Sequence, residues 1–129
     1  NKNGGLLIID YGYLNNSMMD SLQAVKNHKK VNILKNYGSS DITYKINFKT
    51  IKKISKCLNL KPQGITTQRK FLLKLGILER AEIISKKLPF SKKADIYFRL
   101  KRLIDKNQMG ELFKVMLITN KKTKFQIGF

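Results

Sequence analysis

An uninterrupted apolar run stands almost at the start of the chain and limits what the sequence can fold into. Residues 6–9 read LLII and are followed directly by Asp10, Tyr11, Gly12 and Tyr13. An apolar run of this length is typical of a strand that is buried on both faces, as in a parallel sheet. In α/β proteins, polar residues and glycine after such a strand mark the sheet edge where ligands bind. The run therefore predicts a core strand and a ligand-binding edge directly after it.

Four further regions of the chain have strand patterns. Residues 21–34 predict a hairpin or a pair of short strands around a basic turn. Residues 41–48 alternate apolar and polar side chains and predict one strand. Residues 63–67 predict a short strand, while residues 112–119 and 124–129 predict a terminal hairpin.

Four segments have the spacing of helices, namely residues 49–58, 68–75, 78–87 and 92–104. The side chains expected to face inward from the first, second and fourth are Ile51, Ile54, Cys57, Leu58, Phe71, Leu72, Leu75, Ile96, Tyr97, Leu100, Leu103 and Ile104. Cys57 is the single cysteine, so an intramolecular disulfide is excluded and a buried thiol is expected. Together with the strands, these helices predict a mixed α/β fold.

Length and composition fit one modest domain. The chain has 129 residues, of which 42% are hydrophobic. No apolar run approaches the roughly 20 residues that a membrane-spanning helix needs. Because the chain begins with Asn1 and reaches a strand within a few residues, we expect it to be a piece of a longer protein.

The charge of the chain is strongly positive. Lysine and arginine number 27 against 8 acidic residues, which gives a net charge of +19. Such an excess is compatible with a small basic module that binds nucleic acid. Only Arg69, Arg80, Arg99 and Arg102 are arginines, however, and the lysines are spread along the whole chain. Nucleic-acid readers favour arginine, so the pattern favours an AT-rich coding sequence, with the nucleic-acid module as the alternative.

The sequence contains no self-sufficient catalytic motif. His28 is the single histidine, and the eight acidic residues stand singly, so no metal site is expected. No Gly-x-Ser-x-Gly or P-loop motif occurs. Gly4 and Gly5 precede a strand, whereas a phosphate-binding loop follows a strand and opens a helix. The catalytic residues and any cofactor loop are therefore not identified in these 129 residues.

Five segments of the chain resemble, in the same order, motifs of the MidA-type methyltransferase family. They are residues 4–12 (GGLLIIDYG), 21–28 (SLQAVKNH), 40–48 (SDITYKINF), 67–77 (TQRKFLLKLGI) and 109–115 (MGELFKV). The chain departs from the family pattern at Asn47, where aspartate is usual, and at Arg69, where glycine is usual. The resemblance covers nearly the whole chain.

This resemblance implies a fold and a division of the chain. The family is class I, with a Rossmann-like sheet and a substrate-side insertion. The chain would be the C-terminal part of such an α/β domain. Residues 1–13 would form a core strand, residues 14–104 the substrate-side insertion and helices, and residues 105–129 the terminal hairpin.

The resemblance also implies an activity. It predicts methyl transfer from S-adenosylmethionine to an arginine of a protein, with a subunit of respiratory complex I as the expected substrate. The expected location is the mitochondrial matrix in a eukaryote or the cytoplasm in a bacterium. The family's cofactor-binding loop precedes the matched region, so we expect no cofactor-binding residues here and no activity from the isolated chain. An assembly chaperone that has lost catalysis is a third possibility.

Polar residues in the matched segments are the candidate substrate contacts: Asp10, Tyr11, Tyr13, Asp41, Thr43 and Gln68. Structural roles compete with this interpretation. Asp10 would shape the turn after its strand, Asp41 would start a strand and Gln68 would cap a helix. For Tyr13 the structural role is favoured.

Overall fold

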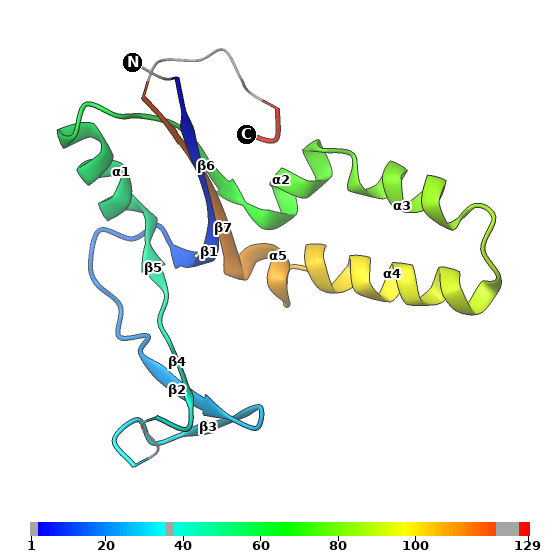
Figure 1. Ribbon diagram of the computed structural model, residues 1–129, viewed down its shortest axis with the longest axis horizontal. Coiled ribbons are helices and arrows are strands. Elements are labelled where there is room, and N and C mark those ends of the chain that lie inside the picture. Colours follow the sequence, from blue (N-terminus) through cyan, green and yellow to red (C-terminus); the bar gives the residue numbers. More distant parts are fainter. Residues whose placement is uncertain (1–2, 36–37, 121–126) are drawn as a thin grey trace.

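The computed structural model describes residues 3–35, 38–120 and 127–129, and its strands form two separate sheets (Figure 1). The main sheet has the order β5-β1-β7-β6, made of Ile46–Asn47, Gly5–Tyr13, Phe113–Thr119 and Lys61–Thr67. The small sheet has the order β3-β2-β4, made of Lys29–Val31, Gln23–Lys26 and Asp41–Thr43. The small sheet lies beyond one end of the main sheet (Figure 1).

The strand directions in the main sheet place two strand ends at one edge. β7 runs antiparallel to both β1 and β6, so β1 and β6 are parallel. The C-terminal ends of β1 and β6 therefore lie at the same edge of the sheet. β5 extends this edge, because Gly12 and Tyr13 pair with Ile46 and Asn47 in parallel register.

The predicted core strand is present, but the prediction that it is buried on both faces is wrong. Leu6, Leu7 and Ile9 are exposed on β1. The main partner of β1 is the antiparallel strand β7, and only its last two residues pair with β5 on the other edge. Within the described residues, no strand pairs with the rest of that edge, so the apolar run is left partly uncovered.

The two faces of the main sheet are covered by different elements. On one face, Ile8, Met116 and Ile118 pack with Phe48 at the start of α1 (Phe48–Cys57). On the other face, Phe129 packs over Gly64 and contacts Phe71 of α2 (Gln68–Lys74), with ring centroids 5.3 Å apart. The core thus lies between α1 and the sheet, with a smaller apolar contact on the opposite side.

Gly12 fits this core because it has no side chain. A Cβ atom at this position would lie 2.3 Å from a ring carbon of Phe48 and 2.8 Å from the carbonyl oxygen of Ile46. Phe48 is fully buried. The glycine therefore lets the ring of Phe48 pack directly against the end of β1.

The small sheet confirms one prediction and corrects another. The predicted hairpin is β2 and β3, joined by Asn27 and His28, which both have positive φ angles. The single strand predicted over residues 41–48 is wrong. β4 belongs to the small sheet, β5 belongs to the main sheet, and Phe48 already starts α1. The alternation of apolar and polar residues continues without a break, although the chain passes from the small sheet to the main sheet between β4 and β5.

The predicted helices are all present, together with a short additional one, and their bounds are α1 Phe48–Cys57, α2 Gln68–Lys74, α3 Ile77–Ser85, α4 Phe90–Ile104 and α5 Met109–Leu112. The prediction of which helix residues face inward is wrong for five of them. These side chains are exposed: Ile54, Cys57, Leu58, Leu75 and Tyr97. The reason is that each helix is covered on only one side. α3 and α4 lie against each other and extend away from the main sheet (Figure 1).

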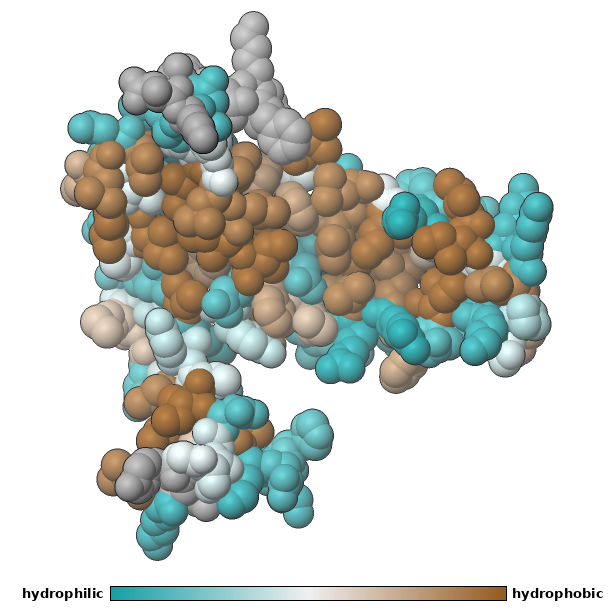
Figure 2. All heavy atoms as spheres, in the orientation of Figure 1, coloured by the Kyte–Doolittle hydropathy of each residue, from teal (hydrophilic) through white to brown (hydrophobic). Residues whose placement is uncertain are grey.

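Apolar side chains gather over the main sheet and again over the α3 and α4 pair (Figure 2). No described helix is long and apolar enough to cross a membrane. The predicted strand over residues 124–129 lies mostly outside the described residues, and residues 127–128 form a turn. β7 pairs with β1 on one edge and with β6 on the other.

Candidate functional site

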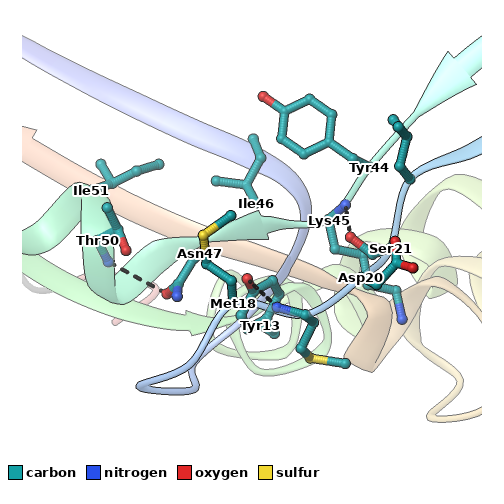
Figure 3. A pocket seen from close by; sticks show the side chains of 12 residues that line it. Tyr13, Met18, Asp20, Ser21, Tyr44, Lys45, Ile46, Asn47, Thr50 and Ile51 are labelled. Atoms are coloured by element: carbon teal, nitrogen blue, oxygen red, sulfur yellow. Dashed lines mark hydrogen bonds between the residues drawn. The ribbon is translucent and has the colours of Figure 1, made fainter.

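A pocket of about 670 Å³ opens at the C-terminal end of β1 (Figure 3). We call it the Tyr13 pocket, since Tyr13 is the last residue of β1 and lines it. The loop residues 18–22, the connection 44–47 and residues 50–51 of α1 form the rest of its wall. These segments meet because β5 pairs with the end of β1 and leads directly into α1.

Hydrogen bonds attach the loop to the strands around this pocket. The backbone N–H of Met19 donates to the hydroxyl oxygen of Tyr13 at 3.1 Å. The backbone N–H of Lys45 donates to the hydroxyl oxygen of Ser21 at 2.9 Å. Each bond joins a loop residue to a residue near the sheet edge, so the shape of the pocket depends on both segments.

Asn47 fixes the other end of the pocket. Its side-chain oxygen accepts hydrogen bonds from the backbone N–H groups of Lys49 at 3.0 Å and Thr50 at 3.4 Å, which caps α1. Its side-chain nitrogen donates to the carbonyl oxygen of Asn15 at 3.2 Å. An aspartate could accept the two capping bonds but could not donate to Asn15. The departure at Asn47 therefore adds an attachment between α1 and the loop.

A second pocket of about 400 Å³ adjoins the first, and we call it the Thr43 pocket. On one side of it are Tyr11 of β1 and Leu112 at the end of α5, and on the other side is the small sheet. The two pockets share Ser21, Tyr44 and Lys45 as lining residues. We refer to the two adjoining pockets at the C-terminal end of β1 together as the groove.

Thr43 carries a notable polar atom in this groove. Its hydroxyl oxygen is buried, and among the described residues it has no hydrogen-bond partner. A buried hydroxyl without a partner costs about 1–3 kcal/mol. A polar atom of a ligand in the Thr43 pocket could remove this cost.

The structure brings four of the six predicted site residues to the groove. Tyr11, Asp41 and Thr43 line the Thr43 pocket, and Tyr13 lines the Tyr13 pocket. Asp41 is also the first residue of β4, in agreement with its structural interpretation.

The other two predicted residues have structural contacts. The carboxylate of Asp10 accepts a hydrogen bond from the backbone N–H of Tyr11 at 2.7 Å, which shapes the end of β1. Gln68 is buried, and its side-chain nitrogen donates to the carbonyl oxygen of Leu103 at 2.9 Å. Neither residue lines the two pockets.

Sequence reasoning missed the loop residues Met18, Met19 and Asp20, which line the Tyr13 pocket. Two methionines beside an aspartate in an otherwise polar stretch were the available signal. Arg69, the second departure from the family pattern, has a structural contact instead. Its guanidinium donates to the carbonyl oxygen of Ile104 at 2.7 Å, at the end of α4.

One lysine near the site has an altered pKa. Lys114 follows the first residue of β7 and is paired with Asp10 and Thr67, at the same sheet edge as the groove. Burial lowers the pKa of Lys114, the Glu111 carboxylate opposes this shift, and the positive charge of Lys45 adds to it. The Lys114 ammonium also donates to the carbonyl oxygen of Glu111. Burial therefore favours the neutral form of Lys114 more than solvent does.

The described residues contain no group of three or more side chains able to hold a metal ion. They also include no glycine-rich loop that leads from a strand into a helix. The groove therefore offers side-chain and backbone contacts to a substrate, while the usual backbone cradle for a nucleotide-like cofactor is not among the described residues.

Residues 1–66 match the family described as "Putative S-adenosyl-L-methionine-dependent methyltransferase". Over 121 residues the chain is 29% identical to the zebrafish (Danio rerio) mitochondrial protein arginine methyltransferase NDUFAF7. This match includes 91% of the chain and 27% of the relative. Over 77 residues it is 36% identical to the Caenorhabditis elegans homolog, which covers 60% of the chain and 18% of the relative.

Two solved structures from Burkholderia thailandensis have a similar fold. One superposes with a TM-score of 0.86 at 23% identity, over 98% of this chain and 35% of that chain. The other contains S-adenosyl-homocysteine and superposes with a TM-score of 0.74 at 26% identity, over 90% of this chain and 32% of that chain. These matches confirm the predicted α/β fold as a portion of a Rossmann-like methyltransferase.

The chain spans 27% and 18% of the lengths of the two curated relatives described above. The matched family model nevertheless includes residues 1–66, slightly more than half of the chain, with β1, the small sheet and α1. The chain belongs to this family of S-adenosyl-L-methionine-dependent methyltransferases, as its resemblance to the MidA-type enzymes predicted.

Proposed function

We propose that this chain forms the substrate side of a methyltransferase that transfers a methyl group from S-adenosylmethionine to an arginine of a protein. The observation that carries the proposal is the groove at the C-terminal end of β1. Ligands of open α/β sheets bind at this end of the strands. The S-adenosyl-homocysteine in a structural relative and the name of the zebrafish relative support the cofactor and the substrate class.

The cofactor supplies the methyl group on its sulfonium sulfur. The contribution of this chain is to position the acceptor nitrogen and to keep water away from it, which is where most of the acceleration of such a reaction originates. Tyr13 fixes the loop through Met19, and Asn47 fixes the start of α1. The walls of the groove are therefore held in place before a substrate binds.

We propose the division of the chain expected from the resemblance, except that residues 113–119 of its last part form the strand β7 between β1 and β6, in place of one arm of a terminal hairpin. Residues 1–13 hold the core strand, and the insertion after it supplies the small sheet and the loop of the Tyr13 pocket. The edge of β1 without a partner among the described residues, with Leu6, Leu7 and Ile9 exposed, is the place where we expect another strand of the complete protein to pair.

The partner and the location follow from the relatives. The proposed substrate is a protein, and the resemblance to MidA-type enzymes extends the proposal to a subunit of respiratory complex I. The curated relatives carry mitochondrial names, which supports the mitochondrial matrix for a eukaryotic source. The nucleic-acid alternative has less support, because Arg69 bonds to Ile104 and Arg99 pairs with Asp95.

Calorimetric titration of S-adenosylmethionine tests this proposal. We expect the complete protein that contains this chain to bind the cofactor and the isolated 129 residues to show no tight binding. Tight binding by the isolated chain would refute the assignment of the cofactor contacts to the rest of the protein. Absence of binding by the complete protein would refute the methyltransferase itself.

A further inference from the structure

We propose that the Tyr13 pocket receives a guanidinium side chain of the substrate protein and that Asp20 is the residue that selects it. This inference rests on the proposed function and names the substrate-binding residue within the same groove. The shape of the pocket, its charge and the lack of partners of the Asp20 carboxylate among the described residues all favour such a ligand.

The pocket has the lining that a long cationic side chain needs. Its wall is mostly apolar, with Met18, Tyr44 and Ile46 among the lining residues. Met18 is 91% exposed and Tyr44 is 62% exposed, so both present apolar surface to solvent. Exposed apolar side chains around a concave site are typical of a binding surface. The methylene groups of an arginine could pack on this surface while its charged end remains near polar groups.

Asp20 supplies the complementary charge. It is the single acidic residue that lines the Tyr13 pocket. Within the described part of the chain, its carboxylate has no ion pair and no hydrogen bond. The carboxylate of Asp95, by contrast, pairs with Arg99 at 3.0 Å, and that of Asp10 accepts a backbone hydrogen bond. Asp20 is therefore available to a ligand.

The net charge of the chain makes this carboxylate more important for the binding of a cationic ligand. A chain of charge +19 repels cationic ligands unless an acidic group offsets the repulsion locally. Lys45 lines the same pocket and would weaken the binding of a cation. It forms no ion pair with Asp20 among the described residues. A cationic ligand would thus gain the Asp20 carboxylate without first breaking a salt bridge.

The side chains at this end of the pocket favour guanidinium over ammonium. Figure 3 shows Asp20 at the same end of the pocket as Tyr44, with Asn47 and Thr50 at the opposite end. A planar guanidinium can stack on an aromatic ring and bond a carboxylate through two N–H groups at once. A lysine ammonium lacks this planar geometry. The pair of Asp20 and Tyr44 therefore fits arginine better than lysine.

The adjoining Thr43 pocket fits the residues next to that arginine. The two pockets share Ser21, Tyr44 and Lys45, so an extended segment can occupy both. The buried hydroxyl of Thr43, which lacks a partner among the described residues, could bond a backbone group of that segment. The groove would then hold an extended peptide, with its arginine in the Tyr13 pocket.

Peptide binding to the complete protein tests the inference. The probes are the peptide acetyl-Gly-Ala-Arg-Ala-Gly-amide and its counterpart with citrulline, which has nearly the same shape but no charge. We expect the wild-type protein to bind the arginine peptide about tenfold more tightly, as for one charge-assisted contact at a partly exposed site. In Asp20→Asn this preference should fall to about one, while Asp20→Glu should retain part of it.

Asp95→Asn is the matched control, because it removes the same charge from an exposed ion pair on α4. It should leave the arginine preference unchanged. The inference is overturned if wild type shows no preference, or if Asp20→Asn keeps it. Titration of S-adenosylmethionine into the same proteins separates the two proposals. If the complete protein binds the cofactor but shows no arginine preference, only the inference about Asp20 is refuted. If the complete protein fails to bind the cofactor, the proposed function is refuted.

Discussion

The main sheet and the segment of residues 14–45 are held together in different ways. The main sheet and α1 contribute fully buried side chains, Phe48, Val115 and Met116, and long backbone ladders join β1, β7 and β6. In the segment 14–45, Ala24 is the buried hydrophobic residue among those described. That segment is attached to the main sheet by β5 and by single hydrogen bonds. The residues that hold the fold together are thus largely separate from the residues that line the groove.

The largest expected effect belongs to the core between the main sheet and α1. Phe48→Ala removes a fully buried ring that packs with Met116, Ile118 and the end of β1. We expect a loss of about 3–5 kcal/mol in the free energy of unfolding, measured by chemical denaturation of the complete protein. A loss below about 1 kcal/mol would show that Phe48 is not at the centre of the core. Leu34→Ala, at an exposed position of the segment 14–45, is the control.

A smaller and different effect is expected at the groove. Tyr13→Phe removes the hydroxyl oxygen that accepts the hydrogen bond from Met19. The free energy of unfolding should change by only about 0.5–1.5 kcal/mol. The KM for a protein substrate should rise several-fold, because the loop of the Tyr13 pocket loses an attachment.

Tyr97→Phe, on the exposed side of α4, is the matched control and should leave the KM unchanged. If Tyr13→Phe instead unfolds the protein, the two regions are not separable. If it changes neither stability nor KM, the loop does not depend on this hydrogen bond.

The smallest effect concerns pH. Burial lowers the pKa of Lys114 in the folded protein below its ordinary value of 10.5. Between these two pKa values the unfolded chain binds more protons at this residue, so its contribution to the stability rises with pH in that window. Lys114→Met should remove this rise, as measured by denaturation at a series of pH values below 10.5. An unchanged pH profile would contradict the burial of the ammonium.

Much of the fold was predictable, since local patterns specify local structure. The helices over residues 68–104 have regular apolar spacing, and the Asn27–His28 turn lies between two short strand-like segments. The exposure of β1 was not predictable, because an apolar run predicts that a strand is buried but does not show which other element of the fold covers it. The break between β4 and β5 was hidden, since the alternation of residues 41–48 continues through both sheets.

The site was predictable only in part. Tyr11, Tyr13, Asp41 and Thr43 lie at the ends of strands, and strand ends at one edge converge in space. Asp20 lies in a loop without periodicity, so no pattern indicated which way its side chain points. Gln68 resembles a site residue in sequence, yet it is buried and bonds to Leu103. Whether such a residue lines the groove or is buried depends on contacts with residues far away in the sequence, and local sequence patterns do not show these contacts.

Transfer of a labelled methyl group tests the central claim most directly. The complete protein would be incubated with S-adenosylmethionine that carries a deuterated methyl group and with mitochondrial or cell extract, and the modified peptides would be identified by mass spectrometry. We predict deuterated methyl groups on arginine of a specific protein, reduced in the Asp20→Asn variant. Label on no protein, or on lysine or nucleic acid in place of arginine, would contradict the account.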